Sequence, residues 1–258
     1  MTPQIAAGIE YVEAGQGPPV ICLHGIGGDW SSFAPQLGAL PARVISWSMP
    51  GYGASVPIDL TFEDLSASLA EFMKALGVEE AHLVGQSIGG MVAMEHAARR
   101  PDQVLSLSLI GTTPSFGGRD DSFKTAFLKA RLAPLDAGQS MAEMAAESAR
   151  NIVGPIADAA CIAAVEAPMA RVPEGMWRAI LPCLTTFNRR DDLSAMAMPA
   201  CLIAGTHDKN APARTMEKMR EKMPNATYHL IDGAGHMINQ EAPGEVNQIL
   251  TDFLRSQS

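Results

Sequence analysis

The chain has 258 residues and a formal net charge of −9, with 47% hydrophobic and 18% charged residues. This length fits one large domain, or one domain with a sizeable insertion, and the composition excludes a disordered chain. The acidic balance, without any lysine- or arginine-rich run, argues against nucleic acid as a partner. Every apolar run is shorter than the roughly 18 residues that a membrane span needs, so we expect no membrane partner either.

The N-terminal stretch and the cysteines indicate the compartment. Residues 1–15, MTPQIAAGIEYVEAG, have neither the basic segment nor the apolar segment of a signal peptide. The four cysteines show no C-x-x-C spacing and no neighbouring histidine cluster. We therefore expect a cytoplasmic protein with free thiols and without a metal site.

Short apolar runs alternate with longer amphipathic runs in the first part of the chain. Apolar residues in the amphipathic runs recur at helical spacing, which predicts helices between the strands. Strands that alternate with helices predict a mostly parallel sheet with helices on both faces. The expected strands lie at about 8–15, 18–25, 42–49, 81–85 and 104–111, and the expected helices at 61–77 and 88–101.

The strand pattern stops after the first 113 residues and resumes near residue 199. The sequence between these points contains only segments with helical periodicity, at 122–133, 140–153, 156–169 and 175–187. After it come two further strands and two helices, at 199–205, 213–223, 226–233 and 245–256. We therefore predict an α/β core of residues 1–113 and 199–258, interrupted by a helical lid of residues 114–198.

Ser87 is the candidate nucleophile. It stands in the pattern G-x-S-x-G, between an expected strand and an expected helix. A turn this tight forces the serine into a strained conformation, and it can close because Gly85 and Gly89 have no side chains. The hydroxyl would then lie at the carboxyl edge of the sheet, where the helix N-terminus favours developing negative charge.

His236 and Asp208 are the candidate base and its orienting acid. Asp208 follows the strand at 199–205, and His236 follows the strand at 226–233, so both belong to the same sheet edge as Ser87. A serine hydroxyl needs such a base, and the base needs a carboxylate. The chain order Ser, Asp, His is that of the α/β-hydrolase fold.

Other histidines and carboxylates fit these roles less well. His82, His96 and His229 fall inside expected strands or helices, which indicates structural roles. His207 follows the strand before the last one, and Asp232 is expected to shape the loop in which it lies. The exit of the strand at 104–111 carries no carboxylate, which favours Asp208 as the acid.

The segment LHGIGGDW, after the strand at 18–25, is expected to supply oxyanion donors. Gly25 would let the backbone turn toward the nucleophile, so that the Ile26 N–H forms one donor and the Ile88 N–H the second. Gly27 replaces Ile26 if the loop is shifted by one residue. The segment lacks G-x-G-x-x-G spacing and no Walker lysine follows, so neither a nucleotide nor any other cofactor is expected.

Five segments together resemble the α/β-hydrolase superfamily over the whole chain outside the helical block. They are LHGIGGDW, SMPGYGAS, GQSIGG, AGTHD and GAGHM. The resemblance implies the α/β-hydrolase fold, with a mostly parallel central sheet, helices on both faces and a helical lid insertion. It also implies a catalytic triad of Ser87, His236 and Asp208 beneath that lid.

Residues 183–212 and 233–243 look most similar to 3-oxoadipate enol-lactonases and small esterases of this superfamily. Those enol-lactonases usually have an Asn-Ser pair where this chain has His24-Gly25. Hydrolases that cleave C–C bonds of meta-cleavage products typically have tryptophan after the catalytic histidine, where this chain has Met237, so they rank second. Haloalkane dehalogenases and epoxide hydrolases need a nucleophilic aspartate and are excluded, whereas perhydrolase-type relatives share the triad.

The helical block is rich in methionine and supplies candidate pocket walls. An arginine in or near the block could bind a substrate carboxylate in bidentate fashion, although each one alone is expected to be a surface charge. The expected substrate-binding residues are Trp30, Met91, Phe116, Trp177 and Met237, and the candidate arginines are Arg119, Arg131, Arg171, Arg178, Arg189 and Arg190.

The sequence therefore predicts a serine hydrolase that cleaves a small carboxylic ester or lactone through an acyl-enzyme. Its partner would be a small-molecule substrate, and the oligomeric state stays open, with a homodimer as one option. Three alternatives also stay open. They are a C–C hydrolase of vinylogous 1,5-diketones, a non-catalytic ligand sensor on the same fold, and a cofactor-free oxygenase that uses the histidine alone.

Overall fold

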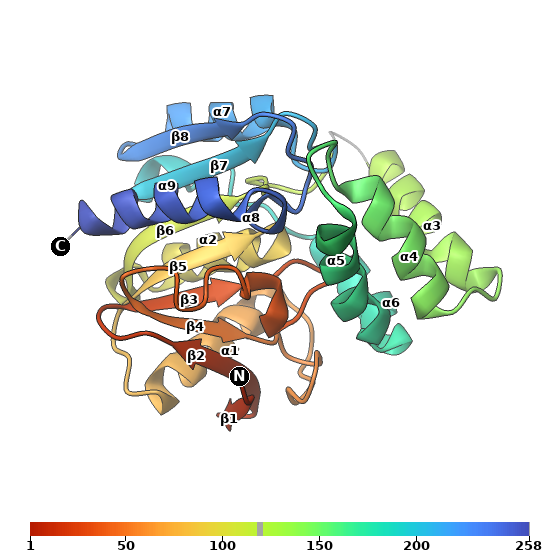
Figure 1. The fold of residues 1–258 in the computed structure, drawn as a ribbon, viewed down its shortest axis with the longest axis horizontal. Helices are drawn as coiled ribbons and strands as arrows, with labels where there is room; N and C mark the ends of the chain where they lie inside the picture. Colours follow the sequence, from red (N-terminus) through yellow and green to blue (C-terminus); the bar gives the residue numbers. More distant parts are fainter. Residues whose placement is uncertain (118–120, 258) are drawn as a thin grey trace.

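A central β-sheet organises the molecule, for which a computed structural model describes residues 1–117 and 121–257. Within these residues the sheet has eight strands in the order β1-β2-β4-β3-β5-β6-β7-β8 (Figure 1). Strands β3 to β8 run parallel, and β1 and β2 are antiparallel to their neighbours. The strands are β1 (Gln4–Ala6), β2 (Ile9–Ala14), β3 (Pro19–Leu23), β4 (Arg43–Trp47), β5 (Ala81–Gln86), β6 (Val104–Ile110), β7 (Ala200–Gly205) and β8 (Ala226–Ile231).

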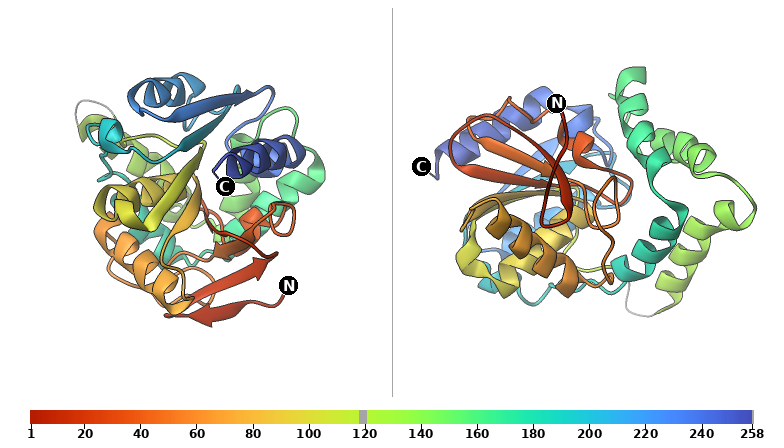
Figure 2. Two further views of the ribbon diagram at one scale, coloured as in Figure 1. Left: turned by 90° about the vertical axis from the view of Figure 1, so that its left-hand side faces the viewer. Right: turned by 90° about the horizontal axis from the view of Figure 1, so that it is seen from below.

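Helices cover both faces of this sheet (Figure 2). Along β3, Ile21 and Leu23 pack into one apolar cluster, whereas Val20 and Cys22 pack into another on the opposite face. This alternation explains the continuous apolar run, because a strand buried on both faces needs apolar residues at every position. The first cluster includes residues of α1 (Phe62–Ala75), α2 (Ile88–Arg99) and α7 (Ala213–Lys222), and the second includes residues of the 3-10 helix η1 (Trp30–Phe33) and of α9 (Pro243–Arg255).

Local signals in the sequence set the helix boundaries. The Thr61 side chain accepts a hydrogen bond from the Asp64 N–H (3.0 Å) and so caps the first turn of α1. The buried residues Leu65, Leu69 and Phe72 recur along one face of α1. Gly77 follows the helix with φ of 67°, a left-handed conformation typical of a glycine after a helix end.

A helical insertion separates β6 from β7. It lies beyond the carboxyl ends of the parallel strands, toward which the arrowheads of β3 and β7 point (Figure 1). In the described part of the insertion, the only strand-like pairing is an isolated bridge between Ser115 and Asn188. The helices fall within residues 114–198 and are α3 (Asp121–Asp136), α4 (Met141–Ile152), α5 (Ala159–Arg171), α6 (Glu174–Leu184) and the short 3-10 helix η3 (Leu193–Ala195).

The predicted fold class, a mostly parallel sheet between two helical layers, is confirmed. The sequence analysis missed strand β1, which has three residues, and helix α8 (Ile238–Glu241), which has four. Elements this short carry too few residues for a periodic signal. Of the helices built from described residues, none combines the length and the apolarity needed to cross a membrane.

Candidate active site

Ser87 lies on the tight turn between β5 and α2. Its backbone has φ of 54° and ψ of −121°, a strained conformation for a residue with a side chain. A Cβ atom on Gly85 would collide with the Gly89 carbonyl oxygen, and one on Gly89 would collide with the Leu23 carbonyl oxygen. The two glycines are therefore required because strand, turn and helix approach each other closely at this point.

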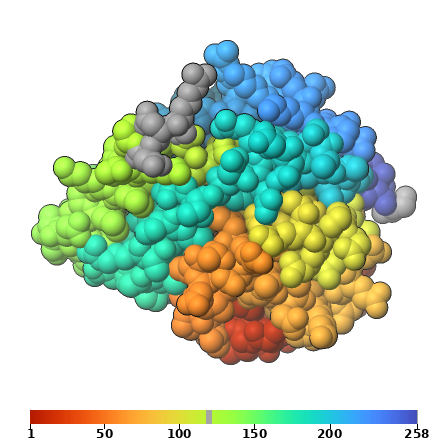
Figure 3. All heavy atoms as spheres, turned by 180° about the vertical axis from the view of Figure 1, so that it is seen from behind, coloured from red at the N-terminus to blue at the C-terminus, as the bar shows by residue number. Residues whose placement is uncertain are grey.

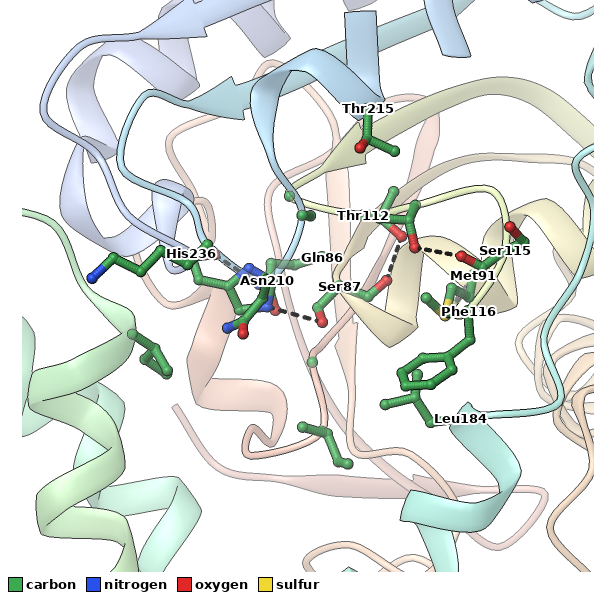
Figure 4. A pocket seen from close by; sticks show the side chains of 18 of the residues that line it. Gln86, Ser87, Met91, Thr112, Ser115, Phe116, Leu184, Asn210, Thr215 and His236 are labelled. Atoms are coloured by element: carbon green, nitrogen blue, oxygen red, sulfur yellow. Dashed lines mark hydrogen bonds between the residues drawn. The ribbon is translucent and has the colours of Figure 1, made fainter. Parts of the chain in front are cut away.

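His236 joins Ser87 to Asp208 through two hydrogen bonds, of which Figure 4 shows the one to Ser87. The His236 Nε2 atom lies 3.0 Å from Ser87 Oγ, and the Nδ1 atom lies 2.9 Å from Asp208 Oδ2. With the proton on Nδ1, His236 donates to the carboxylate and accepts from the serine hydroxyl. The other Asp208 oxygen accepts the N–H groups of Asn210 (2.8 Å) and Ala211 (2.9 Å), which fixes the carboxylate.

The topology of the sheet explains how three residues distant in sequence meet. Ser87 follows β5 directly, Asp208 lies three residues after the end of β7, and His236 lies five residues after the end of β8. These strands run parallel, so their carboxyl ends lie at one edge of the sheet. The structure thus brings together the three residues that the sequence analysis selected.

Gln86 and Thr112 support the triad and were missed by the sequence analysis. The Gln86 Nε2 atom donates to the His236 carbonyl oxygen at 2.9 Å, and Thr112 Oγ1 donates to the Ser87 carbonyl oxygen at 2.7 Å. Both side chains therefore fix the backbone of a candidate catalytic residue. The available signal was a polar residue directly before Ser87, at the end of a strand whose six residues are all buried.

Glu241 connects the loop of His236 to the helical insertion and was also missed. Its Oε2 atom accepts the N–H groups of Gly154 (2.7 Å) and Gly235 (2.8 Å), and its Oε1 atom accepts the Met237 N–H (2.8 Å). Gly154 belongs to the loop between α4 and α5, whereas the other two donors flank His236. We call the contacts of Glu241 with Gly154, Gly235 and Met237 the Glu241 clasp.

A backbone contact strengthens this connection. The His236 N–H donates to the Ile152 carbonyl oxygen at 2.7 Å, so the histidine itself is bonded to the end of α4. Cβ atoms on Gly154 or Gly235 would collide with the backbone of the facing loop. The catalytic loop and the insertion therefore touch backbone to backbone.

The predicted oxyanion donors lie on two loops next to Ser87. Ile88 is the first residue of α2, where an N–H has no acceptor within the helix. Gly25, Ile26 and Gly27 line the same cavity as Ser87, and a hydrogen bond from the Gly28 N–H to the Gly25 carbonyl oxygen (2.9 Å) closes their turn. This arrangement agrees with the use of Ile26 and Ile88 as donors, with Gly27 as the shifted alternative.

His24 holds the loop of Ile26 in place. Its Nε2 atom accepts the Met49 N–H at 2.8 Å, and its Nδ1 atom lies 2.7 Å from the Gly25 carbonyl oxygen, to which it donates. Burial lowers the pKa of His24 below its usual value, which favours the neutral ring that these two bonds require. His24 is therefore a structural part of the oxyanion loop.

A cavity of about 660 Å³ lies between the sheet edge and the insertion, with Ser87 and His236 in its wall. Figure 4 shows His236 and Asn210 on one side of Ser87, and Met91, Phe116 and Leu184 on the other. Of the residues predicted to bind substrate, Met91, Phe116, Trp177 and Met237 line this cavity. Further apolar walls come from Phe123, Phe127, Ile152, Met169, Leu181, Leu184, Leu193 and Met219.

Trp30 lies elsewhere. It packs, half-buried, against the apolar cluster that includes α9, whereas Trp177 belongs to the cluster that includes α1, α2 and α7. The reason is the helix η1, which begins at Trp30 and is capped by the Asp29 side chain, so that the chain turns away from the cavity after Gly28. The position of Trp30 in the sequence, just after the candidate oxyanion loop, was therefore not enough to predict that it lines the cavity.

The candidate arginines that the structure describes divide into two groups. Three form ion pairs with carboxylates, as Arg171 does with Asp29 at 2.6 Å, whereas Arg131 and Arg190 line the cavity. Arg119 lies outside the described residues. The other two ion-paired arginines are Arg178, which binds Glu174 and Asp136, and Arg189, which binds Glu95 and Asp192.

The remaining histidines and Asp232 have partners outside the triad. His82 Nδ1 lies 2.7 Å from Ser106 Oγ, and His96 Nδ1 lies 3.2 Å from Ser66 Oγ, both inside the core. Burial lowers the pKa of both rings, that of His96 to about 4. His207 and Asp232 both contact the Thr206 hydroxyl at the surface, and His229 lies within β8.

The chain is similar to known proteins of one family. The sequence profile of the family described as alpha/beta hydrolase fold matches residues 18–243. A pimeloyl-acyl-carrier-protein methyl ester esterase of Chromobacterium violaceum is 30% identical over 88% of this chain and 90% of its own length. A protein of Azorhizobium caulinodans named as carbamate hydrolase RutD is 28% identical, over 96% of this chain and 95% of that protein.

A longer relative and a solved structure complete the comparison. The dihydrolipoyllysine-residue acetyltransferase component of an acetoin cleaving system from Pseudomonas putida is 29% identical over 93% of this chain, which spans only 64% of that protein. The structure of a thermophilic esterase from Thermogutta terrifontis superposes with a TM-score of 0.87 at 23% identity, covering 100% of this chain and 99% of the esterase. The chain belongs to the α/β-hydrolase fold family.

Proposed function

We propose that the protein is a serine hydrolase that cleaves a small carboxylic ester or lactone through an acyl-enzyme. The observation that carries this proposal is the continuous hydrogen-bonded series from Ser87 Oγ through His236 to Asp208, in the wall of a mainly apolar cavity. That arrangement provides a nucleophile, its base and the group that orients the base.

In the first half-reaction, Ser87 Oγ attacks the substrate carbonyl carbon while His236 Nε2 takes the hydroxyl proton. Asp208 keeps the imidazole in its orientation and stabilises the imidazolium. The Ile26 and Ile88 N–H groups stabilise the oxyanion. His236 then gives its proton to the leaving alkoxide as the C–O bond breaks, which leaves the acyl group on Ser87.

In the second half-reaction, His236 takes a proton from water, whose oxygen attacks the acyl carbon. The tetrahedral intermediate collapses, the carboxylic acid is released, and the proton on His236 returns to Ser87 Oγ. In a lactone the alcohol and the acyl group belong to one molecule, so the ring opens in the first step and the hydroxy acid leaves in the second.

The names of the relatives support this chemistry. A methyl ester esterase and a carbamate hydrolase both add water to a carbonyl group that carries a leaving group. The helices α3 to α6 would act as the lid over the acyl group, since each of them supplies apolar residues to the cavity wall. The acyl-enzyme would then lie in a largely apolar cavity, and the water that hydrolyses it would react there.

Ser87→Ala tests the proposal, with Ser148→Ala as the matched control because Ser148 also lines the cavity. Wild-type protein and the control should bind a fluorophosphonate probe covalently and hydrolyse 4-nitrophenyl butyrate. Ser87→Ala should lose the label, and its kcat/KM should fall by a factor on the order of 10³ or more.

Three results would point to the alternatives. Wild-type protein that neither takes the label nor turns over any ester or lactone would favour a ligand sensor. Preference for a vinylogous 1,5-diketone over every ester would indicate a C–C hydrolase. Full turnover of the physiological substrate by Ser87→Ala would indicate an oxygenase in which the histidine acts alone.

A further inference from the structure

The cavity has a charge opposite to that of the protein as a whole. The chain contains 28 aspartates and glutamates but only 19 lysines and arginines. Among the residues whose side chains the structure describes, which do not include Asp121, no carboxylate lines the cavity, whereas five cationic side chains do. These five are Arg131, Arg190, Lys209, Lys218 and Lys222.

The cations converge from separate segments of the chain. Lys218 and Lys222 lie on the face of α7 that also presents Thr215 and Met219 to the cavity, because residues three, four and seven apart share one face of a helix. Arg131 comes from α3, Arg190 from the segment after α6, and Lys209 from the loop of Asp208. Figure 3 shows α3, the segment after α6 and α7 meeting on one face of the molecule.

Arg131 differs from the ion-paired arginines of the insertion. It is half-buried, its Nη2 atom donates to the neutral Asn210 Oδ1 at 3.2 Å, and its guanidinium lies 5.4 Å from the centre of the Phe127 ring. No carboxylate of the described residues pairs with it. Burial accordingly lowers the pKa of Arg131, since no carboxylate with a described side chain compensates the loss of hydration.

The three lysines at this site are also without an ion pair among the residues that the structure describes. They are exposed, so each one alone contributes little. Together with Arg131 and Arg190 they form a positively charged cleft with apolar walls. Such walls concentrate the electrostatic field of the cations on a ligand in the cleft. An anionic ligand is the one kind of ligand that gains from all five groups.

Asn210 relates this charge to the triad. Its side chain accepts from Arg131, and its backbone N–H donates to Asp208. The guanidinium lies next to Asn210, which Figure 4 shows on the His236 side of Ser87, and also next to the Phe127 ring. A substrate whose carbonyl lies at Ser87 can therefore place a charged part at Arg131 and an apolar part against the aromatic and aliphatic cavity wall.

We propose that the substrate carries an anionic group, a carboxylate or a phosphate, which binds Arg131 while the scissile carbonyl lies at Ser87. This inference rests on the proposed ester or lactone hydrolysis and narrows its substrate class. Lys209 and Lys218 assist from the neighbouring loop and helix, and Lys222 and Arg190 attract the anion at the mouth of the cavity.

The test compares matched substrates. We expect the wild-type kcat/KM for 4-nitrophenyl hydrogen adipate to exceed that for its neutral methyl ester by about tenfold or more. This ratio should fall toward one as sodium chloride is added. A 4-nitrophenyl ester of matched length that ends in phosphate, run in parallel, shows which of the two anions the site prefers.

Variants assign the preference to residues. Arg131→Gln should reduce the ratio of anionic to neutral turnover by about tenfold, Lys218→Gln should reduce it by about two- to threefold, and Arg131→Lys should restore part of it. Arg178→Gln is the control, because Arg178 lies on the same insertion but is ion-paired with Glu174 and Asp136. It should keep the wild-type ratio.

The outcomes separate this inference from the proposed function. Ser87-dependent hydrolysis with a ratio near one, or with a ratio that Arg131→Gln leaves unchanged, would overturn the anion site and leave ester hydrolysis intact. Calorimetry of Ser87→Ala with monomethyl adipate against dimethyl adipate measures the same site without turnover. Equal binding of these two compounds would also overturn the inference, whatever the enzyme hydrolyses.

Discussion

The α/β core and the helical insertion contribute to the active site in different ways. Core strands such as β3 and β7 are buried on both faces, and the turns that leave strands carry Ser87, Asp208 and His236. In the insertion, apolar side chains such as Phe123, which is 52% exposed, line the cavity instead of a closed core. Parallel strand ends determine the chemistry, whereas the packing of α3 to α6 shapes the space in which the substrate must fit.

The largest effect is expected where the two regions meet, at the Glu241 clasp. In Glu241→Gln, an NH₂ group replaces one of the two oxygens that accept backbone N–H groups around His236. The His236 loop should then shift, and kcat for 4-nitrophenyl butyrate should fall by about 10- to 100-fold, because small misplacements of a catalytic group are costly. Steady-state kinetics checks this, together with the melting temperature.

Glu245→Gln is the control, since Glu245 is exposed in the first turn of α9. It should retain the wild-type kcat. A Glu241→Gln protein that melts at a lower temperature but keeps the wild-type kcat would show that the clasp stabilises the fold without positioning His236.

Two buried tryptophans allow a direct comparison of the regions. Trp177 in α6 lines the cavity and Trp47 in β4 packs near Phe72, and within the described residues neither indole N–H has a partner. Phenylalanine at either position should cost roughly 1–3 kcal/mol of unfolding free energy. Trp177→Phe should also change the preference between short and long acyl chains by about 3- to 10-fold, whereas Trp47→Phe should not.

The measurement is kcat/KM across a series of 4-nitrophenyl esters, beside chemical denaturation of both variants. Equal changes in chain-length preference at the two positions would mean that substrate selection is not a property of the insertion.

The smallest effect on activity is expected at His96, where the change concerns the pH dependence of core stability. Burial lowers the pKa of His96 from 6.5 to about 4, so the unfolded chain binds the proton more readily than the folded protein between these values. The contribution of the neutral ring to stability is complete above about pH 6.5 and declines as pH falls toward 4. Between pH 6.5 and pH 4, the free energy of unfolding of the wild type should fall by up to about 3 kcal/mol more than that of His96→Gln.

Urea denaturation at a series of pH values measures this difference. Parallel pH profiles for wild type and His96→Gln would show that the ring takes up a proton without unfolding.

The same contrast between core and insertion explains what the sequence could predict. Ser87, Asp208 and His236 were predictable because each follows a strand, and strand order along the chain fixes where strand ends meet. The helices of the insertion were predictable from their periodicity. The side chains that face the cavity were harder to predict. Their orientation depends on how the helices pack against the core, and periodicity carries no information about that packing.

Individual residues illustrate this limit. Trp30 was predicted to line the cavity because it follows the segment of Gly25 to Gly28. A capped 3-10 helix instead directs it to the face of the sheet that α9 covers. Arg131 was one of six equivalent arginines until Asn210 and Phe127 set it apart. Glu241 gave no signal at all, because its partners are backbone N–H groups, which every sequence possesses.

The Glu241 clasp also limits how product can leave. Besides its two chain connections and the Arg171–Asp29 and Arg189–Glu95 ion pairs, the insertion is attached to the core through Gly154 and Ile152, by the loop of His236. A rigid outward swing of α4 and α5 would therefore pull His236 away from Ser87. Hydrolysis creates a carboxylate inside a cavity that cationic side chains line, and slow release with inhibition by the acid product is the expected kinetic consequence.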